Sequence, residues 1–211
     1  MELKDLSFAV VDVETTGTWV NGGDRIMEVA VVQLRDGGIK TVAEFLVNPQ
    51  RPVSRWVTRL TGIRWDMLHE APTFGDVADR VAESLEGSVF VAHNMRFDWR
   101  FLSMELKRAT GKSLNANAPR LCTVKFARRL LSHLPRRNLD ALAWHYEVEI
   151  VGRHRAGGDA RATARVLRHM LADARRHDID TWDQLQAYLR APRPTPVRSA
   201  LPQPVRVEAV A

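Results

Sequence analysis

Apolar residues change their spacing along the chain, and the change predicts a domain that combines strands with helices. Short, nearly uninterrupted apolar runs at 8–11, 26–34, 39–47 and 88–92 predict buried strands. A turn at 36–38, Asp-Gly-Gly, separates the second run from the third. Three of these runs precede most of the helical patterns. The expected fold is therefore α/β, with a mixed sheet and helices packed around it.

Helical periodicity begins after Pro72. Thr73 suits the N-cap of a helix that we expect Gly87 to end. A second helix is expected between Asn94, as its N-cap, and about Thr110. Further helical patterns cover 121–131, 138–146, 158–175 and 181–189.

The composition changes after residue 190. Residues 191–211 hold five of the ten prolines and no aromatic residue, which is typical of chain that forms no packed core. We therefore expect one domain over 1–190, followed by a disordered proline-rich tail over 191–211. A tail of this kind suits the tethering of a protein partner.

Charge and cysteine content narrow the function classes. The formal net charge of +6 keeps nucleic acid open as a partner. Cys122 is the single cysteine, which excludes an intramolecular disulfide and a zinc site built from clustered cysteines. No apolar run approaches the roughly 18 residues that span a membrane. We expect neither a signal peptide nor a membrane helix, and a cytoplasmic location.

Two carboxylates lie at the end of the first predicted strand. Asp12 and Glu14 are two positions apart, so on a strand their side chains point to the same face. Two buried carboxylates repel each other and lose hydration, and a divalent cation relieves both effects. The spacing alone is also compatible with acidic side chains on the solvated face of an edge strand.

A second acidic position follows the strand at 88–92. Asp98 falls in the first turn of the helix that Asn94 is expected to cap, where the helix dipole favours a negative charge. Taken alone, this position is explained by helix stability. His93, beside Asn94, is in the same way explained by burial in the core.

A third segment holds a histidine and an aspartate on either side of two glycines. Gly157 and Gly158 predict a loop, and Asp159 is expected to begin the helix that follows it. His154 is then expected on the preceding loop, where it is free to move toward a bound substrate. A histidine with a pKa near neutrality suits a general base. The alternative is a surface histidine on a flexible loop.

In this order and on these elements, the three segments resemble the motifs of the histidine-containing branch of the DEDD exonuclease superfamily, the family of the proofreading subunit of bacterial DNA polymerase III. The resemblance covers about residues 6–175. The matching segments are Asp-Val-Glu-Thr-Thr-Gly at 12–17, Thr-Gly-Ile at 61–63, Ala-His-Asn-x-x-Phe-Asp at 92–98, Cys-Thr-Val at 122–124 and His-Arg-Ala-x-x-Asp-Ala at 154–160.

This resemblance implies a fold, a cofactor and a reaction. The implied fold is ribonuclease H-like, a mixed five-stranded sheet flanked by helices in one domain. The implied cofactor is a pair of divalent cations, Mg²⁺ or Mn²⁺. Asp12 would bridge both ions, Glu14 and Asp159 would complete the water-activating site, and Asp98 would hold the ion at the leaving group. His154 would deprotonate the water, releasing 5′-mononucleotides stepwise from the 3′ end of DNA.

Residues beside the acids are the implied substrate contacts, namely Thr15, Thr16, Gly17, His93, Asn94 and Phe97. Two basic stretches without any acid, at 51–64 and 120–137, are candidates for holding backbone phosphates. The alternative for both stretches is an ordinary solvated surface.

Two other functions stay open. The same metal site would serve RNA trimming or the degradation of short oligonucleotides, because no motif here fixes contacts to the 2′-hydroxyl. A subunit that acts mainly by binding a DNA polymerase is the second. The expected substrate is a single-stranded or frayed 3′ end of DNA, with RNA and a DNA polymerase as the other partners considered.

Overall fold

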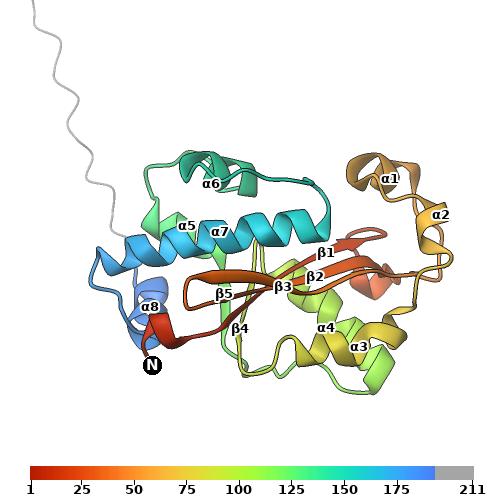
Figure 1. The fold of residues 1–211 in the computed structure, drawn as a ribbon, viewed down its shortest axis with the longest axis horizontal. Coiled ribbons are helices and arrows are strands. Elements are labelled where there is room, and N and C mark those ends of the chain that lie inside the picture. Colours follow the sequence, from red (N-terminus) through yellow and green to blue (C-terminus); the bar gives the residue numbers. More distant parts are fainter. Residues whose placement is uncertain (193–211) are drawn as a thin grey trace, which may run out of the picture.

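A computed structural model describes residues 1–192 and contains a five-stranded sheet with helices on both faces (Figure 1). The strand order is β3-β2-β1-β4-β5. β2 runs antiparallel to β1 and β3, whereas β4 runs parallel to β1 and β5. The strands are β1 (Phe8–Thr15), β2 (Ile26–Arg35), β3 (Gly38–Leu46), β4 (Val89–Ala92) and β5 (Arg120–Cys122). The expected mixed α/β sheet is confirmed, and β1 is its central strand.

Within residues 1–192 the helices form one group on each face of the sheet and a separate pair, α1 and α2, in the connection between β3 and α3 (Figure 1). The α-helices are α1 (Arg55–Thr61), α2 (Trp65–Leu68), α3 (Phe74–Glu83), α4 (Arg96–Thr110), α5 (Thr123–Leu130), α6 (Leu139–His145), α7 (Ala156–Arg175) and α8 (Trp182–Arg190). Two short 3₁₀ helices, η1 (Leu3–Asp5) and η2 (Val20–Gly22), complete the set.

Alternation along β1 divides the core into two layers. Val11 and Val13 pack with α3 and α4 on one face, whereas Phe8 and Val10 pack with α5, α6 and α7 on the other. The row that begins with Phe8 and Val10 continues into the two carboxylates of the strand. The fold therefore turns these carboxylates toward the face that α7 covers.

The two glycines before Asp159 lie inside a helix, so the loop predicted for them is wrong. α7 begins at Ala156 and includes both Gly157 and Gly158 in its first turn. A Cβ atom on Gly158 would collide with the backbone carbonyl of Gly152, and one on Gly157 would collide with the carboxylate of Glu44. The glycines are there because the start of α7 packs closely on its neighbours.

The N-cap predicted at Asn94 is also wrong. Asn94 has a left-handed backbone with φ of 68°, and α4 begins two residues later, with Met95 as its N-cap. Asparagine is one of the few residues besides glycine that adopt this conformation readily. Asp98 still lies in the first turn of α4, as expected.

Other predicted bounds need smaller corrections. α3 is capped by Thr73, as expected, but ends at Glu83 rather than Gly87. The helix expected over 121–131 loses its first two residues to β5. α8 ends at Arg190, and most of the tail predicted over 191–211 lies outside the described residues, so the domain boundary stays a prediction. In residues 1–192 no helix combines the length and the apolarity that crossing a membrane requires.

Candidate metal and catalytic centre

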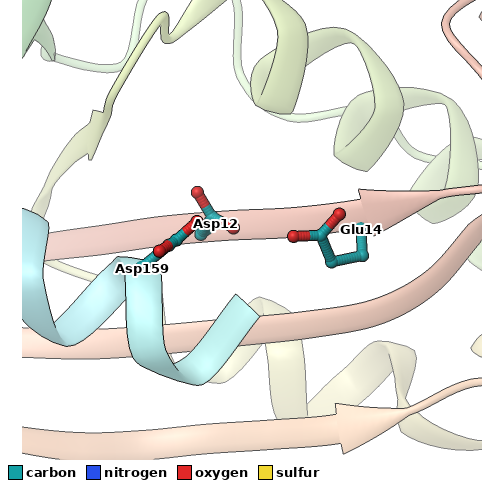
Figure 2. A group of neighbouring side chains, drawn as sticks. All are labelled: Asp12, Glu14 and Asp159. Carbon is teal, nitrogen blue, oxygen red and sulfur yellow. The ribbon is translucent and has the colours of Figure 1, made fainter. Parts of the chain in front are cut away.

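Three carboxylates meet where the central strand passes the first turn of α7 (Figure 2). Asp12 and Glu14 come from β1, and Asp159 comes from α7. One oxygen from each lies within 4.8 Å of the other two. Sequence positions about 145 residues apart are thus brought into one cluster, because α7 packs along the face to which β1 turns its carboxylates.

Asp98 approaches the same strand from α4. Its carboxylate is buried, and Oδ1 accepts a hydrogen bond of 3.2 Å from the backbone N–H of Val13. It is not among the three side chains whose oxygens meet within 4.8 Å. The negative charge of Asp98 nevertheless contributes, after burial, to raising the pKa of Asp12. The fourth predicted carboxylate is therefore adjacent to the cluster.

Burial and mutual repulsion make this cluster costly to ionise. Burial raises the pKa of Asp12 well above its usual range, and the neighbouring carboxylates raise it further. Burial first, and then the charge of Asp159, raise the pKa of Glu14 to about 8. Burial also raises the pKa of Asp98 to about 8 and that of Asp159 above its ordinary value. A bound divalent cation would permit all four carboxylates to be charged at neutral pH.

The donor atoms fit a hard divalent cation. All are carboxylate oxygens, the ligands that Mg²⁺ and Mn²⁺ prefer. Asp159 Oδ1 is fully buried and has no hydrogen-bond partner among the described residues. A buried acceptor without a partner is destabilising unless something binds it, and a cation held by this cluster would do so.

His154 lies on the loop before α7, as expected. Its backbone is left-handed with φ of 59°, and its N–H donates to Asp159 Oδ2 over 3.3 Å. The side chain is half-buried. The structure therefore brings His154 and Asp159 together. The backbone of His154, rather than its imidazole, makes the hydrogen bond to the cluster.

A buried glutamate that the sequence reading missed lies beside the cluster. Glu28 on β2 is opposite Glu14 in the antiparallel register. Arg155 donates to Glu28 through two nitrogens, the shorter contact being 2.6 Å, and the backbone N–H of Ala156 adds another at 2.8 Å. An acid inside the apolar run 26–34 was the available signal, whereas its partner is 127 residues away.

Arg153 is a second residue that the sequence reading missed. Its guanidinium donates to Asp159 and, over 2.8 Å, to Asp140 on α6. It also adjoins Nδ1 of His154 at 3.4 Å. The chain contains many arginines, so an arginine next to His154 is not unusual in the sequence. No sequence pattern therefore indicated a role for Arg153.

The hydroxyls predicted to contact substrate hold the turn after β1. Thr15 Oγ1 donates to the carbonyl of Gly17, and Thr16 Oγ1 donates to Asp24 over 3.0 Å. The backbone N–H of Arg25 donates to Thr16 over 3.1 Å. A Cβ atom on Gly17 would collide with the Asp24 carboxylate. The turn therefore needs these residues for its own shape, and their substrate contacts stay predictions.

The candidates on β4 and α4 differ in what they already contact. His93 shares a hydrogen bond of 2.9 Å with Thr123, and burial lowers the pKa of His93 to about 4, so its ring is neutral. Phe97 is half-buried and packs on Phe101, with ring centroids 4.8 Å apart. Asn94 is exposed. Of the three, Asn94 has the freest side chain for a ligand.

The basic stretch 51–64 is divided by the fold. Arg51 pairs with Asp24 at 3.2 Å and Arg64 with Asp66 at 2.8 Å. Arg55 and Arg59 lie on α1, exposed, and have no ion pair within the described part of the chain. Arg55 and Arg59 are therefore the two of these four arginines that no carboxylate of the described residues engages.

The basic stretch 120–137 is divided in the same way. Arg120 lies over the ring of Trp99, 4.5 Å from its centroid, and Arg129 lies over Tyr188 at 4.8 Å. Arg128 instead lines a surface hollow that also exposes His93. The hollow is lined by His93, Asn94, Val124, Arg128, Pro135, Arg137 and Asn138. This basic hollow adjoins two of the predicted substrate contacts.

The exonuclease family model, RNase T, matches residues 9–167, a span that contains all four carboxylates and His154. The DNA polymerase III PolC-type protein of Caldanaerobacter subterraneus subsp. tengcongensis is 35% identical over 86% of this chain. A putative bifunctional exonuclease/endonuclease protein of Mycobacterium tuberculosis is 37% identical over 90% of it. The matches take up 13% and 30% of those proteins, so this chain corresponds to a minor part of each.

One solved structure is similar over nearly its full length. It is described as exonuclease X in complex with 5′ overhanging duplex DNA. The similarity covers 86% of this chain and 99% of that one, with a TM-score of 0.68 and 26% sequence identity. The sheet and the surrounding helices are thus shared with an exonuclease of similar size.

Proposed function

The chain belongs to the RNase T exonuclease family, and from that membership we propose that it is a metal-dependent 3′–5′ exonuclease of the histidine-containing DEDD branch. It hydrolyses DNA from the 3′ end to 5′-mononucleotides, in proofreading or repair. The observation that carries this proposal is the meeting of Asp12, Glu14 and Asp159 within 4.8 Å, next to a loop that holds His154.

Asp12, Glu14, Asp98 and Asp159 are the residues that would hold two divalent cations, Mg²⁺ or Mn²⁺. Bound there, the cations supply Lewis acidity toward the scissile phosphate and lower the pKa of a water. The chain itself contributes carboxylates in fixed positions. β1 and α7 bring Asp12, Glu14 and Asp159 together, and α4 places Asp98 beside them.

His154 is proposed to accept the proton of the attacking water. A general base needs a lone pair within hydrogen-bond reach of that water and some freedom to adjust as substrate binds. Two observations support this role: His154 lies on the loop before α7, and its backbone N–H donates to Asp159 of the cluster. The proton passes to the imidazole while the oxygen attacks phosphorus and the 3′ oxygen of the preceding nucleotide leaves.

The proposed substrate path runs over surfaces of positive charge. Arg128 and Arg137 line the hollow beside His93 and Asn94, where they would meet backbone phosphates of the strand. Two findings support DNA over RNA, namely the similarity to PolC-type DNA polymerase III and to exonuclease X, whose structure contains DNA. The first relative also supports a polymerase context, as a partner or in the same pathway.

A nuclease assay tests the proposal. Single-stranded DNA, a duplex with a mismatched 3′ terminus and single-stranded RNA, each labelled at the 3′ end, are incubated with Mn²⁺, with Mg²⁺ or with EDTA. We expect labelled 5′-mononucleotide as the first product from both DNAs, none in EDTA, and slower release from RNA. Faster release from RNA would favour the exoribonuclease alternative.

Matched controls separate this enzyme from contaminants. Asp12→Asn protein prepared in the same way removes one charge from the cluster and leaves the strand intact, so it should release nothing. Internal fragments instead of mononucleotides, or full activity in EDTA, would contradict the proposal.

A further inference from the structure

One arginine joins the loop of His154 to two helices. Arg153 Nε and Nη2 donate to the two carboxylate oxygens of Asp140 on α6, over 2.8 and 3.2 Å. Its Nη1 donates to Oδ2 of Asp159 on α7. Two edges of one rigid, planar guanidinium are therefore engaged by carboxylates from different helices. Its position is fixed by both.

The two oxygens of Asp159 have different surroundings. Oδ2 accepts from Arg153 and from the backbone N–H of His154. Oδ1 is buried and unpartnered within residues 1–192. A rotation of the carboxylate would break both bonds to Oδ2. These bonds therefore hold the carboxylate in one orientation and leave Oδ1 as the oxygen without a hydrogen-bond donor.

Arg153 also supplies charge to the cluster. Its positive charge acts against burial to lower the pKa values of Asp12, Glu14 and Asp159. Asp140 partly neutralises the positive charge of Arg153 by forming an ion pair with the other edge of its guanidinium. The ion pair with Asp140 therefore limits how strongly Arg153 opposes a cation.

We propose that Arg153, held by Asp140, is a positioning residue that orients the Asp159 carboxylate for metal binding and fixes the C-terminal end of the loop that carries His154. The inference rests on the proposed function in one respect, that the carboxylate cluster binds a divalent cation. Partners that orient a metal ligand in this way typically change metal affinity by roughly 10–100-fold when they are removed.

The test measures Mn²⁺ binding by titration calorimetry on the full chain, for the unaltered protein and for Arg153→Gln, Arg153→Lys and Asp140→Asn. We expect Arg153→Gln to weaken Mn²⁺ affinity about 10-fold. Arg153→Lys should not restore it, because an ammonium cannot engage both carboxylates in the geometry of a guanidinium. Asp140→Asn should weaken affinity less, since Asp159 keeps its arginine.

Arg161→Gln is the matched control. Arg161 lies on α7, two residues after Asp159, is exposed to a similar extent as Arg153, and pairs with Glu44 over 2.8 Å. Its loss should leave Mn²⁺ affinity unchanged. The pH profile of nuclease kcat gives a second readout, because displacement of the His154 loop by Arg153→Gln should shift the profile, whereas Arg161→Gln should not.

The outcomes distinguish this inference from the proposed function. Unchanged or tighter Mn²⁺ binding by Arg153→Gln would overturn the positioning role, and tighter binding would show an internal competitor of the cation. Full recovery with lysine would overturn it in favour of charge alone. If the unaltered protein binds no Mn²⁺, the proposed function itself fails. Should Arg153→Gln not fold, Asp140→Asn carries the test.

Discussion

Asp12 and His154 differ in how firmly the fold holds them. Asp12 lies in the central strand, between two buried valines and opposite Ala30 of β2. His154 lies on a loop, and its half-buried imidazole contacts Arg153 at 3.4 Å. Substitutions at the two positions should therefore separate chemistry from the architecture of the site.

We expect His154→Ala to fold and to bind divalent metal normally, because no predicted metal ligand is removed. Its kcat should fall by about 10²–10⁴-fold, the usual contribution of a general base. The measurement is steady-state release of mononucleotide from single-stranded DNA, with metal affinity measured in parallel. His177→Ala, an exposed histidine beyond the end of α7, is the control. Near-normal turnover of His154→Ala would show that His154 is not the general base.

Asp98→Asn tests whether the fourth carboxylate acts through its charge. An amide keeps an oxygen to accept from the N–H of Val13, so the fold should persist. Turnover should fall at least 10²-fold if Asp98 helps to hold a metal ion, in line with the loss of other stabilising catalytic groups. Circular dichroism and the same nuclease assay provide the measurement. Activity close to that of the unaltered protein would show that Asp98 serves only the helix.

At the scale of elements, the close packing of the first turn of α7 on the neighbouring backbone places Asp159 in the site. We expect Gly158→Ala to be destabilising by about 1–3 kcal/mol, because its methyl group meets backbone that cannot move aside. Gly157→Ala should be milder, since the Glu44 side chain can shift away. Thermal unfolding of the two variants provides the comparison. Equal stabilities would mean that the first turn of α7 adjusts freely.

Elements with a local signature could be predicted from the sequence, whereas β5, which has none, could not. β1, β2 and the helix over 138–146 follow from apolar spacing. β5 has only three residues and is defined by its pairing with β4. Because the helical pattern of α5 follows it directly, the sequence predicted a helix over both segments. The site divides in the same way. Its acids fall in recognisable motifs, whereas the pair of Arg155 and Glu28 joins positions 127 residues apart.

At the scale of the whole molecule, the acidic cluster links stability to pH. Burial raises the pKa of Glu14 from 4.5 to about 8, and that of Asp98 from 3.8 to about 8. Between these limits the folded protein binds protons that the unfolded chain releases. Rising pH therefore disfavours the folded state, and this contribution to the free energy of unfolding is lost as pH approaches 8.

We expect the melting temperature in EDTA to fall between about pH 5 and pH 8, and Mg²⁺ to raise it more at the higher pH, because bound cations replace the protons. The comparison of the unaltered protein with Asp98→Asn isolates the cluster, since the variant should show a shallower fall. Equal slopes for the two proteins would contradict the assignment of these raised pKa values.

The two-layer division of β1 has a consequence for insertions and deletions. Every second residue of the strand belongs to the layer under α7, so a single-residue deletion within 8–11 that kept the pairing with β2 would reverse the parity of the remainder. The two carboxylates would then enter the apolar layer under α3 and α4, and valines would take their places. Length changes here are tolerable only in steps of two. Asp12 and Glu14 are consequently bound to the strand register, whereas the loop before α7 has no such restriction.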